Sequence, residues 1–511
     1  MDRVARVTTI ALSGVSGTPV TVETAVTNQL PGIAIIGLPD TALAEAKLRV
    51  KLACAQAGYP LKDQFITVNL SPAALPKHGS AFDLGIAIAC MSACKYLPKL
   101  TGKTCAYIGE LSLDGELRRP NGLLSAVRAA REHGYQQVMV PAVGAVEAAL
   151  VPNITVIAVQ NLAGAVNWHH GKPAGWFIQS PADSSETPHQ QSEILPDLAE
   201  IIGQPEAVEA LQIAAAGRHN MAMIGPPGVG KTMIASALPG ILPELEDIAA
   251  LETSCVASLA DTPIVQLCRL PPFEAPHHSA TSAAILGGGS GRLVPGAITR
   301  AHNGVLFLDE APEFNRGVLD ALRQPLEQGE IKLQRAHSSA AFPAKFQLLL
   351  AANPCPCGFA YSLNPKQVCT CPPAKVIRYL NKISGPLRDR IDLTVKLNPV
   401  ISSVADKNLA VSTKTAKQRV QTARQRQRDR YQNCAWSLNS ETPGVWLRDP
   451  ENRPSRQALA ILDQSLANGA LSLRGYDRVL RVAWTIADLA EKAKPEREEI
   501  TQALLLRGNQ R

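Results

Sequence analysis

The chain has 511 residues, which is too long for one compact hydrophobic core and indicates about three domains of ordinary size. Hydrophobic residues make up 46% of the chain and charged residues 19%, a balance that excludes an extensively disordered protein. The net charge of +7 permits an anionic partner without requiring one, so only local clusters of charge can point to nucleic acid.

The N-terminal residues carry no basic stretch followed by a long apolar run, so we expect no signal peptide. No apolar run approaches the roughly 18 residues that a membrane-spanning helix needs, and we expect no membrane partner. Eleven cysteines, an odd number, favour reduced thiols over a disulfide framework. These features predict a cytoplasmic protein.

Residues 1–171 alternate between strand and helix patterns. Strands are predicted at 18–26 and 65–72, and helices at 40–58 and 82–94. The pattern is typical of an α+β domain. Residues 172–196 are rich in Pro, Ser, Gln and acidic residues without an apolar period, and we predict a linker there.

Residues 197–400 hold short apolar strands that alternate with helices, the arrangement of a parallel α/β sheet. The strands are predicted at 221–225, 304–310 and 346–353. Residues 401–511 are predicted to form an all-helical lid, with helices at 407–431 and 455–507. We find no fixed-period repeat that would indicate a solenoid.

A phosphate-binding loop is predicted between the strand at 221–225 and the helix that follows it. The match to G-x-x-x-x-G-K-[ST] consists of Gly225, Pro226, Pro227, Gly228, Val229, Gly230, Lys231 and Thr232. The glycines let backbone N–H groups surround phosphates, Lys231 can neutralise them, and the Thr232 hydroxyl can bind Mg²⁺. These letters could match by chance, but the flanking strand and helix favour an ATP site.

The strand at 304–310 ends in two carboxylates, where open α/β sheets bind ligands. We predict that Asp309 holds Mg²⁺ and that Glu310 polarises the attacking water. A solvated acidic turn is the alternative, and the upstream loop disfavours it. Asn353 ends the strand at 346–353 and could orient water near the γ-phosphate, although Asn often caps a turn before Pro.

Further along, arginines recur beside acidic residues or within a few helical turns of one another. They are Arg388, Arg390, Arg474, Arg478 and Arg481. A motor needs at least two arginines to stabilise charge on the phosphates, one of them supplied by a neighbouring subunit, whereas surface salt bridges explain some of the others.

Two C-x-C pairs follow Asn353, within an insert predicted at 354–373. Cys355, Cys357, Cys369 and Cys371 could together bind one Zn²⁺ tetrahedrally. The usual spacing in structural zinc sites is C-x₂₋₄-C, so reduced, unliganded cysteines remain an alternative, and a redox switch is a third.

Several motifs together resemble the magnesium-chelatase-like AAA+ family, most closely its ComM branch. The motifs are GPPGVGKT, APHHSATSAAILGGG, GVLFLDEAPEF, ANPCPCG and ISGPLRDRIDL. In the first domain LPGIAIIGLPD, NLSPAALPKHGSAFDLGIAIA and IGELSLDGELR resemble the family's Lon-protease-like (S5-like) N-terminal domain. The resemblance covers nearly the whole chain. It implies an α/β AAA+ P-loop NTPase core between that domain and the helical lid.

The resemblance also implies a homo-hexameric ring with ATP between subunits. Asn353 would be sensor 1, Arg390 the arginine finger and Arg474 sensor 2. ComM proteins are ATP-dependent DNA helicases that promote branch migration during homologous recombination in natural transformation. The implied partners are single-stranded and branched DNA, with a recombinase as a further partner.

Two groups of basic residues are candidates for DNA contact. Residues 414–430 carry seven basic residues against one acidic residue, which suits sequence-tolerant phosphate binding but also a solvated helix face. Residues 330–346 read as a hairpin, and in this family such hairpins face the ring's pore. The candidates are Lys332, Arg335 and His337 in the hairpin and Lys414, Lys417, Arg419 and Arg424 in the helix.

The sequence departs from the family pattern in places. Laid on the Lon protease motif, Ala81 stands at the nucleophile, and Leu124 stands at the partner lysine, so we expect a non-proteolytic first domain. Glu274 stands where the family carries Arg, which puts a phosphate contact there in doubt. A magnesium-chelatase-type motor subunit and a protein-remodelling ATPase remain alternatives to the helicase.

Overall fold

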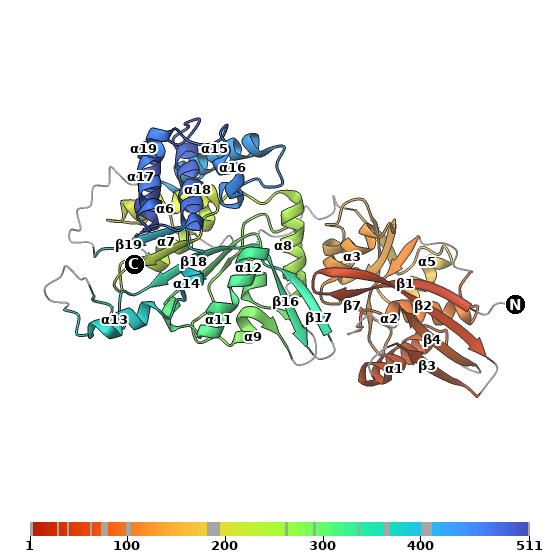
Figure 1. Ribbon diagram of the computed structural model, residues 1–511. Helices are drawn as coiled ribbons and strands as arrows, with labels where there is room; N and C mark the ends of the chain where they lie inside the picture. Colours follow the sequence, from red (N-terminus) through yellow and green to blue (C-terminus); the bar gives the residue numbers. More distant parts are fainter. Residues whose placement is uncertain are drawn as a thin grey trace.

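The computed structural model describes residues 4–27, 30–37, 40–61, 64–72, 80–98, 104–180, 195–260, 264–289, 293–335, 338–360, 368–399 and 411–508. Three parts follow one another along the chain: an N-terminal part built on a large sheet, a central part built on a parallel sheet, and a helical C-terminal part that packs on the central one (Figure 1). Within the described ranges, no helix is both long enough and apolar enough to span a lipid bilayer.

The N-terminal part holds an eight-stranded mixed sheet in the order β10-β9-β8-β5-β1-β2-β4-β3. Buried residues of alternate strand positions and of the central helix α2 form its hydrophobic core. Its elements are β1 (Val4–Ser13), β2 (Ser16–Thr27), β3 (Gly32–Ile36), α1 (Asp40–Gln56), β4 (Phe65–Ser71), α2 (Asp83–Ala93), β5 (Cys105–Tyr107), β6 (Glu110–Leu111), β7 (Leu117–Arg118), α3 (Leu123–Glu132), β8 (Gln137–Pro141), α4 (Ala145–Ala148), β9 (Thr155–Val159), α5 (Leu162–His169) and β10 (Trp176–Gln179).

The predicted strands and helices of this part are confirmed within a few residues, but the predicted linker begins too early. Residues Trp176–Gln179 form β10, which pairs antiparallel with β9 at the edge of the sheet. An edge strand needs only one partner and few buried side chains, so its composition resembles that of a linker. Residues 181–194 of the predicted linker lie outside the described ranges.

The central part holds a five-stranded sheet in the order β12-β15-β18-β11-β19, in which every neighbouring pair is parallel. This confirms the predicted parallel sheet. Its elements are α6 (Pro205–Gly217), β11 (Met221–Ile224), α7 (Lys231–Ile241), α8 (Asp247–Leu259), β12 (Phe273–Glu274), α9 (Ser282–Leu286), β13 (Gly287–Gly288), β14 (Val294–Pro295), α10 (Ala297–Arg300), β15 (Val305–Leu308), α11 (Arg316–Ala321), α12 (Arg323–Gln328), β16 (Glu330–Arg335), β17 (Ser338–Pro343), β18 (Gln347–Ala352), α13 (Pro373–Leu380), α14 (Gly385–Arg388) and β19 (Leu393–Lys396).

The C-terminal part is helical, as predicted, and shares one hydrophobic core with the central sheet. Phe307 and Leu349 of the sheet belong to the same buried cluster as Leu459 and Leu480 of the C-terminal helices. The helices are α15 (Thr413–Tyr431), α16 (Gly444–Arg448), α17 (Arg456–Ala467), α18 (Leu473–Leu489) and α19 (Arg497–Arg507).

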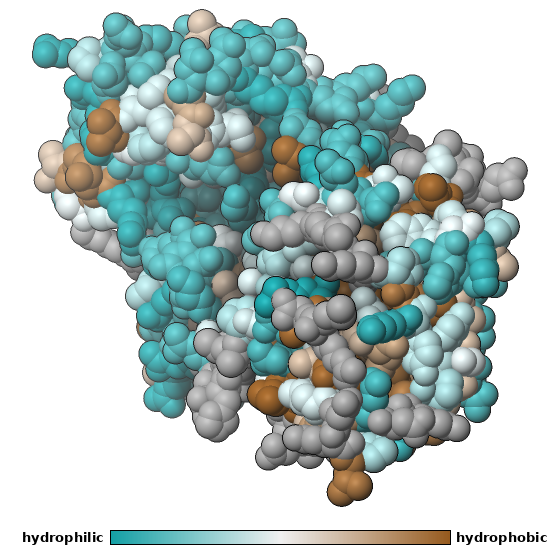
Figure 2. Space-filling model, turned by 90° about the vertical axis from the view of Figure 1, so that its right-hand side faces the viewer, coloured by the Kyte–Doolittle hydropathy of each residue, from teal (hydrophilic) through white to brown (hydrophobic). Residues whose placement is uncertain are grey.

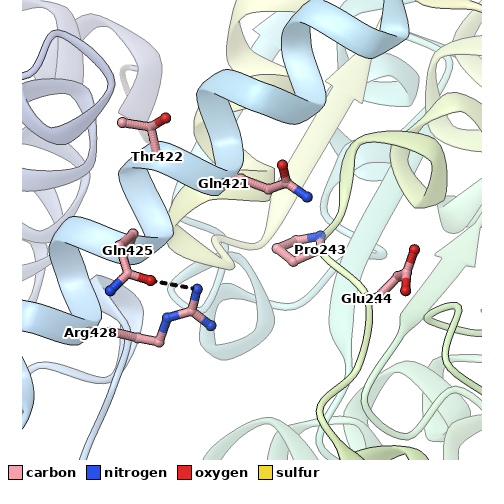
Figure 3. A pocket seen from close by; sticks show the side chains of 6 residues that line it. All are labelled: Pro243, Glu244, Gln421, Thr422, Gln425 and Arg428. Carbon is pink, nitrogen blue, oxygen red and sulfur yellow. Dashed lines mark hydrogen bonds between the residues drawn. The ribbon is translucent and has the colours of Figure 1, made fainter.

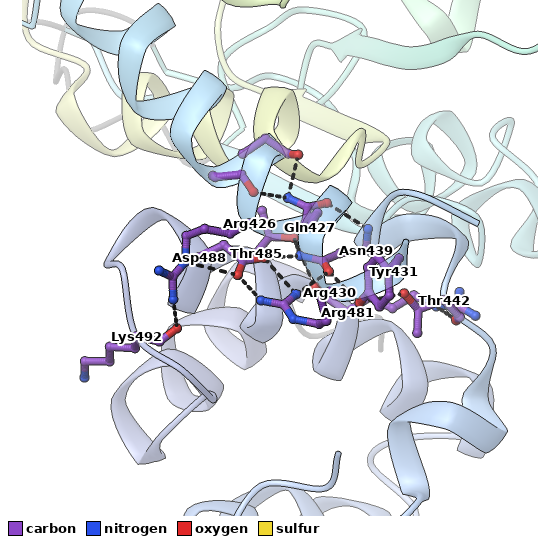
Figure 4. A network of polar contacts seen from close by, with 12 residues as sticks. Arg426, Gln427, Arg430, Tyr431, Asn439, Thr442, Arg481, Thr485, Asp488 and Lys492 are labelled. Carbon is purple, nitrogen blue, oxygen red and sulfur yellow. Dashed lines mark hydrogen bonds and ion pairs between the residues drawn. The ribbon is translucent and has the colours of Figure 1, made fainter. Parts of the chain in front are cut away.

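A buried carboxylate organises the polar interior of the C-terminal part (Figure 4). The side chain of Asp488 is fully buried and accepts hydrogen bonds from Arg430 at 3.1 Å and from Asn439 at 2.9 Å. Arg426 lies 3.8 Å from the same carboxylate. A buried charge is tolerated only when it is paired and hydrogen-bonded, so this network fixes α15 against α18.

The N-terminal part docks on the central part through α8. Gly122 N donates to Ser258 O at 3.0 Å, and the Ser258 hydroxyl donates to Glu147 Oε1 at 2.6 Å. Glu147 also accepts a hydrogen bond from Arg119 at 3.1 Å, and its side chain is 3% exposed. A buried ion pair that is shared with Ser258 of the other part ties the two parts together.

A second contact joins the β1–β2 turn to the β16–β17 hairpin. Ser13 Oγ donates to Ser339 O at 3.1 Å. Gly14 has φ +65°, and a β-carbon there would lie 2.3 Å from Ala341 O, so only glycine fits this close approach.

Viewed from the N-terminal side, hydrophobic residues on the exposed surface occur singly or in small groups among hydrophilic ones (Figure 2).

The Glu147 network predicts a stability effect. Replacing Glu147 by Gln removes the negative charge of the buried Arg119–Glu147 pair, which should destabilise the docked N-terminal part by roughly 3 kcal/mol. Thermal unfolding of the full chain measures this as a lower midpoint. Glu132→Gln is the matched control because Glu132 pairs with Arg128 on the same helix but is 54% exposed, and it should shift the midpoint little. Equal shifts in the two variants would contradict the assigned role of Glu147.

Candidate functional site

The carboxyl ends of β11, β15 and β18 meet at one edge of the parallel sheet. The loop that follows β11 turns through Gly228 at φ +81° and Gly230 at φ +89°, left-handed conformations that glycine adopts without strain. Helix α7 begins directly after Gly230. The first N–H groups of a helix have no partner within the helix, so this loop and helix N-terminus form a binding site for an anion.

Lys231 lies inside this loop. It is 9% exposed, and its ammonium donates to Gly225 O at 2.6 Å, to Pro226 O at 2.9 Å and to Asn353 Oδ1 at 2.9 Å. Burial lowers the pKa of Lys231, partly offset by the nearby carboxylates of Asp309 and Glu310. Its three hydrogen-bond acceptors are uncharged, so the positive charge is available to a bound phosphate. The contact also brings Asn353 of the third strand to the loop.

Thr232 and Asp309 form the second contact at this edge. Thr232 Oγ1 donates to Asp309 Oδ2 at 2.8 Å, and the other carboxylate oxygen accepts from Glu310 N at 2.8 Å. A hydroxyl and a carboxylate are hard oxygen ligands of the kind Mg²⁺ takes beside nucleotide phosphates. The donor set therefore fits the predicted Mg²⁺ site.

Glu310 follows Asp309 in a left-handed backbone conformation, with φ +52° and ψ +41°. Such a conformation is costly for a residue with a β-carbon, and it occurs where a turn must direct a side chain. The side chain of Glu310 is 48% exposed, and its Oε2 lies 3.1 Å from His278 Nδ1. His278 belongs to the motif APHHSATSAAILGGG, but no sequence pattern pointed to a role for this residue.

Two of the predicted arginines, Arg390 and Arg474, lie together at the carboxylate of Glu327. Arg390 is 8% exposed, contacts the carboxylate of Glu327 on α12 and donates to Pro386 O. Arg474 on α18 is more exposed and lies 3.6 Å from the same carboxylate. Among the described residues, no hydrogen bond or ion pair joins either arginine to residues 225–232 of their own chain. The structure therefore brings Arg390 and Arg474 to one another and not to the phosphate-binding loop.

Arg478 has a structural partner instead. It contacts the carboxylate of Asp392 directly before β19, and His219 lies 3.7 Å from the other oxygen of that carboxylate. Burial alone would raise the pKa of Asp392, but Arg478 and His219 hold this pKa below its usual range. This cluster joins α18 to the start of β19.

Four cysteine sulfurs lie close together in the loop after Asn353. Within the described ranges, the Sγ atoms of Cys355, Cys357, Cys369 and Cys371 all lie within 4.8 Å of one another. The distances from Cys355 Sγ are 3.3 Å to Cys357 Sγ and 3.7 Å to Cys369 Sγ. Four thiolates at about 2.3 Å from one zinc ion stand about 3.8 Å apart, so the geometry fits tetrahedral Zn²⁺.

The cysteine loop rests on the phosphate-binding loop. Gly358 has φ +86°, and a β-carbon there would lie 2.6 Å from Pro227 Cδ. Ala360 N donates to Cys355 Sγ at 3.2 Å, a backbone hydrogen bond that stabilises a thiolate. The cysteine cluster is therefore in a position to support the nucleotide site mechanically.

The predicted hairpin is confirmed, with β16 and β17 paired antiparallel. Lys332 is exposed and lies 2.9 Å from Glu330 Oε1. Arg335 ends β16, and His337 lies outside the described residues. β13 packs under this hairpin, because a β-carbon on Gly287 would lie 2.9 Å from Leu333 Cδ1.

The basic helix α15 is only partly available to DNA. Lys414 is exposed, Lys417 lies 3.8 Å from Glu244, and Arg419 donates to Gln212 Oε1 at 2.9 Å. The exposed face of α15 and the loop after α7 line a shallow polar pocket, in which Arg428 bonds to Gln425 (Figure 3).

The prediction that Arg424 contacts DNA is wrong. Its Nε and Nη2 atoms both donate to Ala215 O, at 3.1 and 2.6 Å, and burial lowers its pKa. The side chain caps the C-terminal end of α6, where a helix presents unpaired carbonyls and negative partial charge. The spacing of the basic residues along the sequence could not show whether the Arg424 side chain bonds within the protein or faces solvent.

Three family models match the chain. The model described as "Magnesium chelatase, subunit ChlI" matches residues 197–405, "Subunit ChlI of Mg-chelatase" matches residues 22–143, and "Magnesium chelatase, subunit ChlI C-terminal" matches residues 410–507. The first match, over residues 197–405, includes every residue described above at the sheet edge.

Relatives match over nearly the full length. An uncharacterized protein of Mycobacterium tuberculosis is 43% identical over 507 residues, covering 98% of each chain. The uncharacterized protein YifB of Escherichia coli is 39% identical, covering 98% of this chain and 96% of YifB. The competence protein ComM of Haemophilus influenzae is 38% identical, covering 97% of this chain and 95% of ComM.

Proposed function

Because this chain belongs to the ComM family of magnesium-chelatase-like AAA+ ATPases, we propose that it hydrolyses ATP at the edge where β11, β15 and β18 end. The main support for this proposal is the buried ammonium of Lys231, which binds the loop carbonyls and Asn353. This ammonium has no anionic hydrogen-bond partner among the described residues. Its charge suits the β- and γ-phosphates of ATP.

Each residue at this edge has one task in hydrolysis. Thr232 and Asp309 supply ligands to Mg²⁺, which when bound neutralises charge that develops on the phosphate oxygens. Glu310 accepts a proton from the attacking water while the water oxygen bonds to the γ-phosphorus and the bond from that phosphorus to the ADP oxygen breaks. Asn353 orients the water or the γ-phosphate from its position beside Lys231.

We propose that the active form is a ring, a homo-hexamer with ATP between subunits. Arg390 and Arg474 meet at Glu327 rather than at residues 225–232, which supports their acting on the ATP of a neighbouring subunit. In the isolated chain Glu327 balances both positive charges. Binding of a neighbour's nucleotide would then compete with Glu327 for the two guanidinium groups.

We propose that the ring moves on DNA and promotes branch migration in homologous recombination during natural transformation, with single-stranded and branched DNA as partners and a recombinase as a further one. The full-length similarity to a competence protein supports this role. Lys332 on the hairpin and Lys414 on α15 are exposed and can meet phosphates, and Lys417 and Arg419 can do so after exchanging their present partners.

We infer that the N-terminal part is a Lon-protease-like fold without proteolytic activity. Leu124, at the predicted position of the catalytic lysine, is fully buried and apolar. Ser80, the serine directly before Ala81, donates its hydroxyl to the carboxylate of Glu110, and no lysine is among its hydrogen-bond partners in the described residues. This part would serve as a scaffold that docks on α8 and on the β16–β17 hairpin.

A magnesium-chelatase-type motor subunit is the second candidate, because the matched family models carry that subunit's description. Such a motor, or a protein-remodelling ATPase, would respond to a protein partner and not to DNA. The partner that stimulates hydrolysis therefore distinguishes the candidates.

We also propose that the four clustered cysteines bind one structural Zn²⁺. The sulfur–sulfur distances of 3.3, 3.6 and 3.7 Å support a single tetrahedral ion. Because Gly358 packs on Pro227, the ion would hold the cysteine loop against the phosphate-binding loop.

The DNA proposal predicts that single-stranded or branched DNA raises the ATPase rate and that binding weakens steeply with salt. Lys332→Ala should weaken binding to all DNA sequences alike. It should also reduce the slope of the logarithm of the binding constant against the logarithm of the salt concentration by about one unit for each chain that contacts DNA. Lys47→Ala, an exposed lysine on α1, is the control and should bind normally. Binding can be followed by fluorescence anisotropy. An ATPase rate unchanged by DNA, with no salt-sensitive binding, would contradict the proposal.

The zinc proposal predicts about one zinc ion per chain in purified protein, measured by elemental analysis. Cys369→Ser should lower the zinc content and the thermal midpoint, because a three-thiolate site holds the ion less tightly. Cys434→Ser is the control, since Cys434 lies outside the cluster. Protein that is free of metal and has four freely titrating thiols in the loop would show that the cluster is not a zinc site.

A further inference from the structure

His278 contacts the carboxylate that the proposed reaction uses as its base. His278 Nδ1 lies 3.1 Å from Glu310 Oε2, within ion-pair distance. The two residues come from different elements, His278 from the segment between β12 and α9, and Glu310 from the turn after β15. This is the only ion pair or side-chain hydrogen bond of Glu310 in the described part of the chain.

The imidazole of His278 is held in place from two sides. The ring of His277 lies 4.1 Å away, centroid to centroid, and the ring of Phe314 meets it edge-on at 6.5 Å. His277 is fixed in turn, because its Nδ1 bonds the Ser279 hydroxyl at 2.7 Å and accepts from Ser279 N at 3.3 Å. Phe314 is buried and follows the short 3₁₀ helix η4 (Ala311–Glu313) that Glu310 precedes.

The carboxylate of Glu310 needs such a partner. Its side chain is 48% exposed, and an exposed glutamate samples several rotamers. A general base works only when its oxygen is held within hydrogen-bond distance of the reacting water. A carboxylate that binds His278 through Oε2 keeps Oε1 for that water.

We propose that His278 is a positioning residue for ATP hydrolysis, which holds Glu310 through Nδ1 so that the free carboxylate oxygen meets the attacking water. The inference rests on the proposed function, because it takes Glu310 as the base. His278 binds neither nucleotide nor metal in this scheme, so its loss should slow the chemical step and leave ATP binding intact.

Steady-state ATPase kinetics of the full-length protein test this proposal. His278→Ala should lower kcat by roughly tenfold or more, the effect of a mispositioned base, while KM for ATP stays within about twofold. His278→Asn should restore most of the rate, because its amide nitrogen occupies the place of Nδ1. His278→Gln should restore less, because its nitrogen occupies the place of Nε2. His133→Ala is the control, because His133 is an exposed histidine directly after α3 in the N-terminal part, and it should retain a rate near that of the wild type.

Glu310→Gln, assayed in parallel, separates two kinds of failure. If Glu310→Gln is inactive and His278→Ala has the wild-type kcat, the positioning role is wrong and the proposed site stands. A rise in KM with unchanged kcat in His278→Ala, or equal rescue by Asn and Gln, also overturns the positioning role. If Glu310→Gln hydrolyses ATP normally, both the proposed catalytic assignment and this inference fail.

Discussion

A lysine ammonium buried among uncharged oxygens is the constraint on which the functional edge of this protein depends. Lys231 lies at the start of α7 and donates to two carbonyls of its own loop and to Asn353 of β18. Such a charge is costly to bury without a bound anion, and burial lowers the pKa of Lys231 although the carboxylates of Asp309 and Glu310 lie nearby. The parallel order β15-β18-β11 is what brings Asp309, Asn353 and Lys231 to the same edge.

Two loops contact this edge, and the N-terminal part contacts the central part at other places. The cysteine loop rests on Pro227 through Gly358, and the segment with His278 meets Glu310. The N-terminal part reaches α8 through the buried Glu147–Ser258 contact and reaches the β16–β17 hairpin through Ser13. The hairpin that is proposed to contact DNA is thus packed against the N-terminal part.

The features that could be predicted from the sequence are those with a local signature. The loop at 225–232, the carboxylates after β15 and the paired strands of the hairpin each depend on neighbouring residues, and the structure has each in the predicted element. The cysteine spacing likewise predicted a cluster, and the four sulfurs do lie together.

The features that could not be predicted depend on contacts between distant residues. The spacing of α15 revealed its charge but not that Arg424 caps α6. The polar composition near Trp176 predicted a linker, whereas these residues form the edge strand β10, which depends on β9 for its pairing. His278 lies far from Glu310 in sequence, so only the tertiary fold reveals their contact.

Equilibrium binding of ATP, measured by calorimetry with and without Mg²⁺, tests most directly whether this sheet edge is a nucleotide site. We expect Mg²⁺-assisted binding that is at least tenfold weaker in Lys231→Ala, a loss of about 1.4 kcal/mol, and unchanged in Lys47→Ala. Equal affinity in the wild type and Lys231→Ala, or no ATP binding by the wild type, would contradict it.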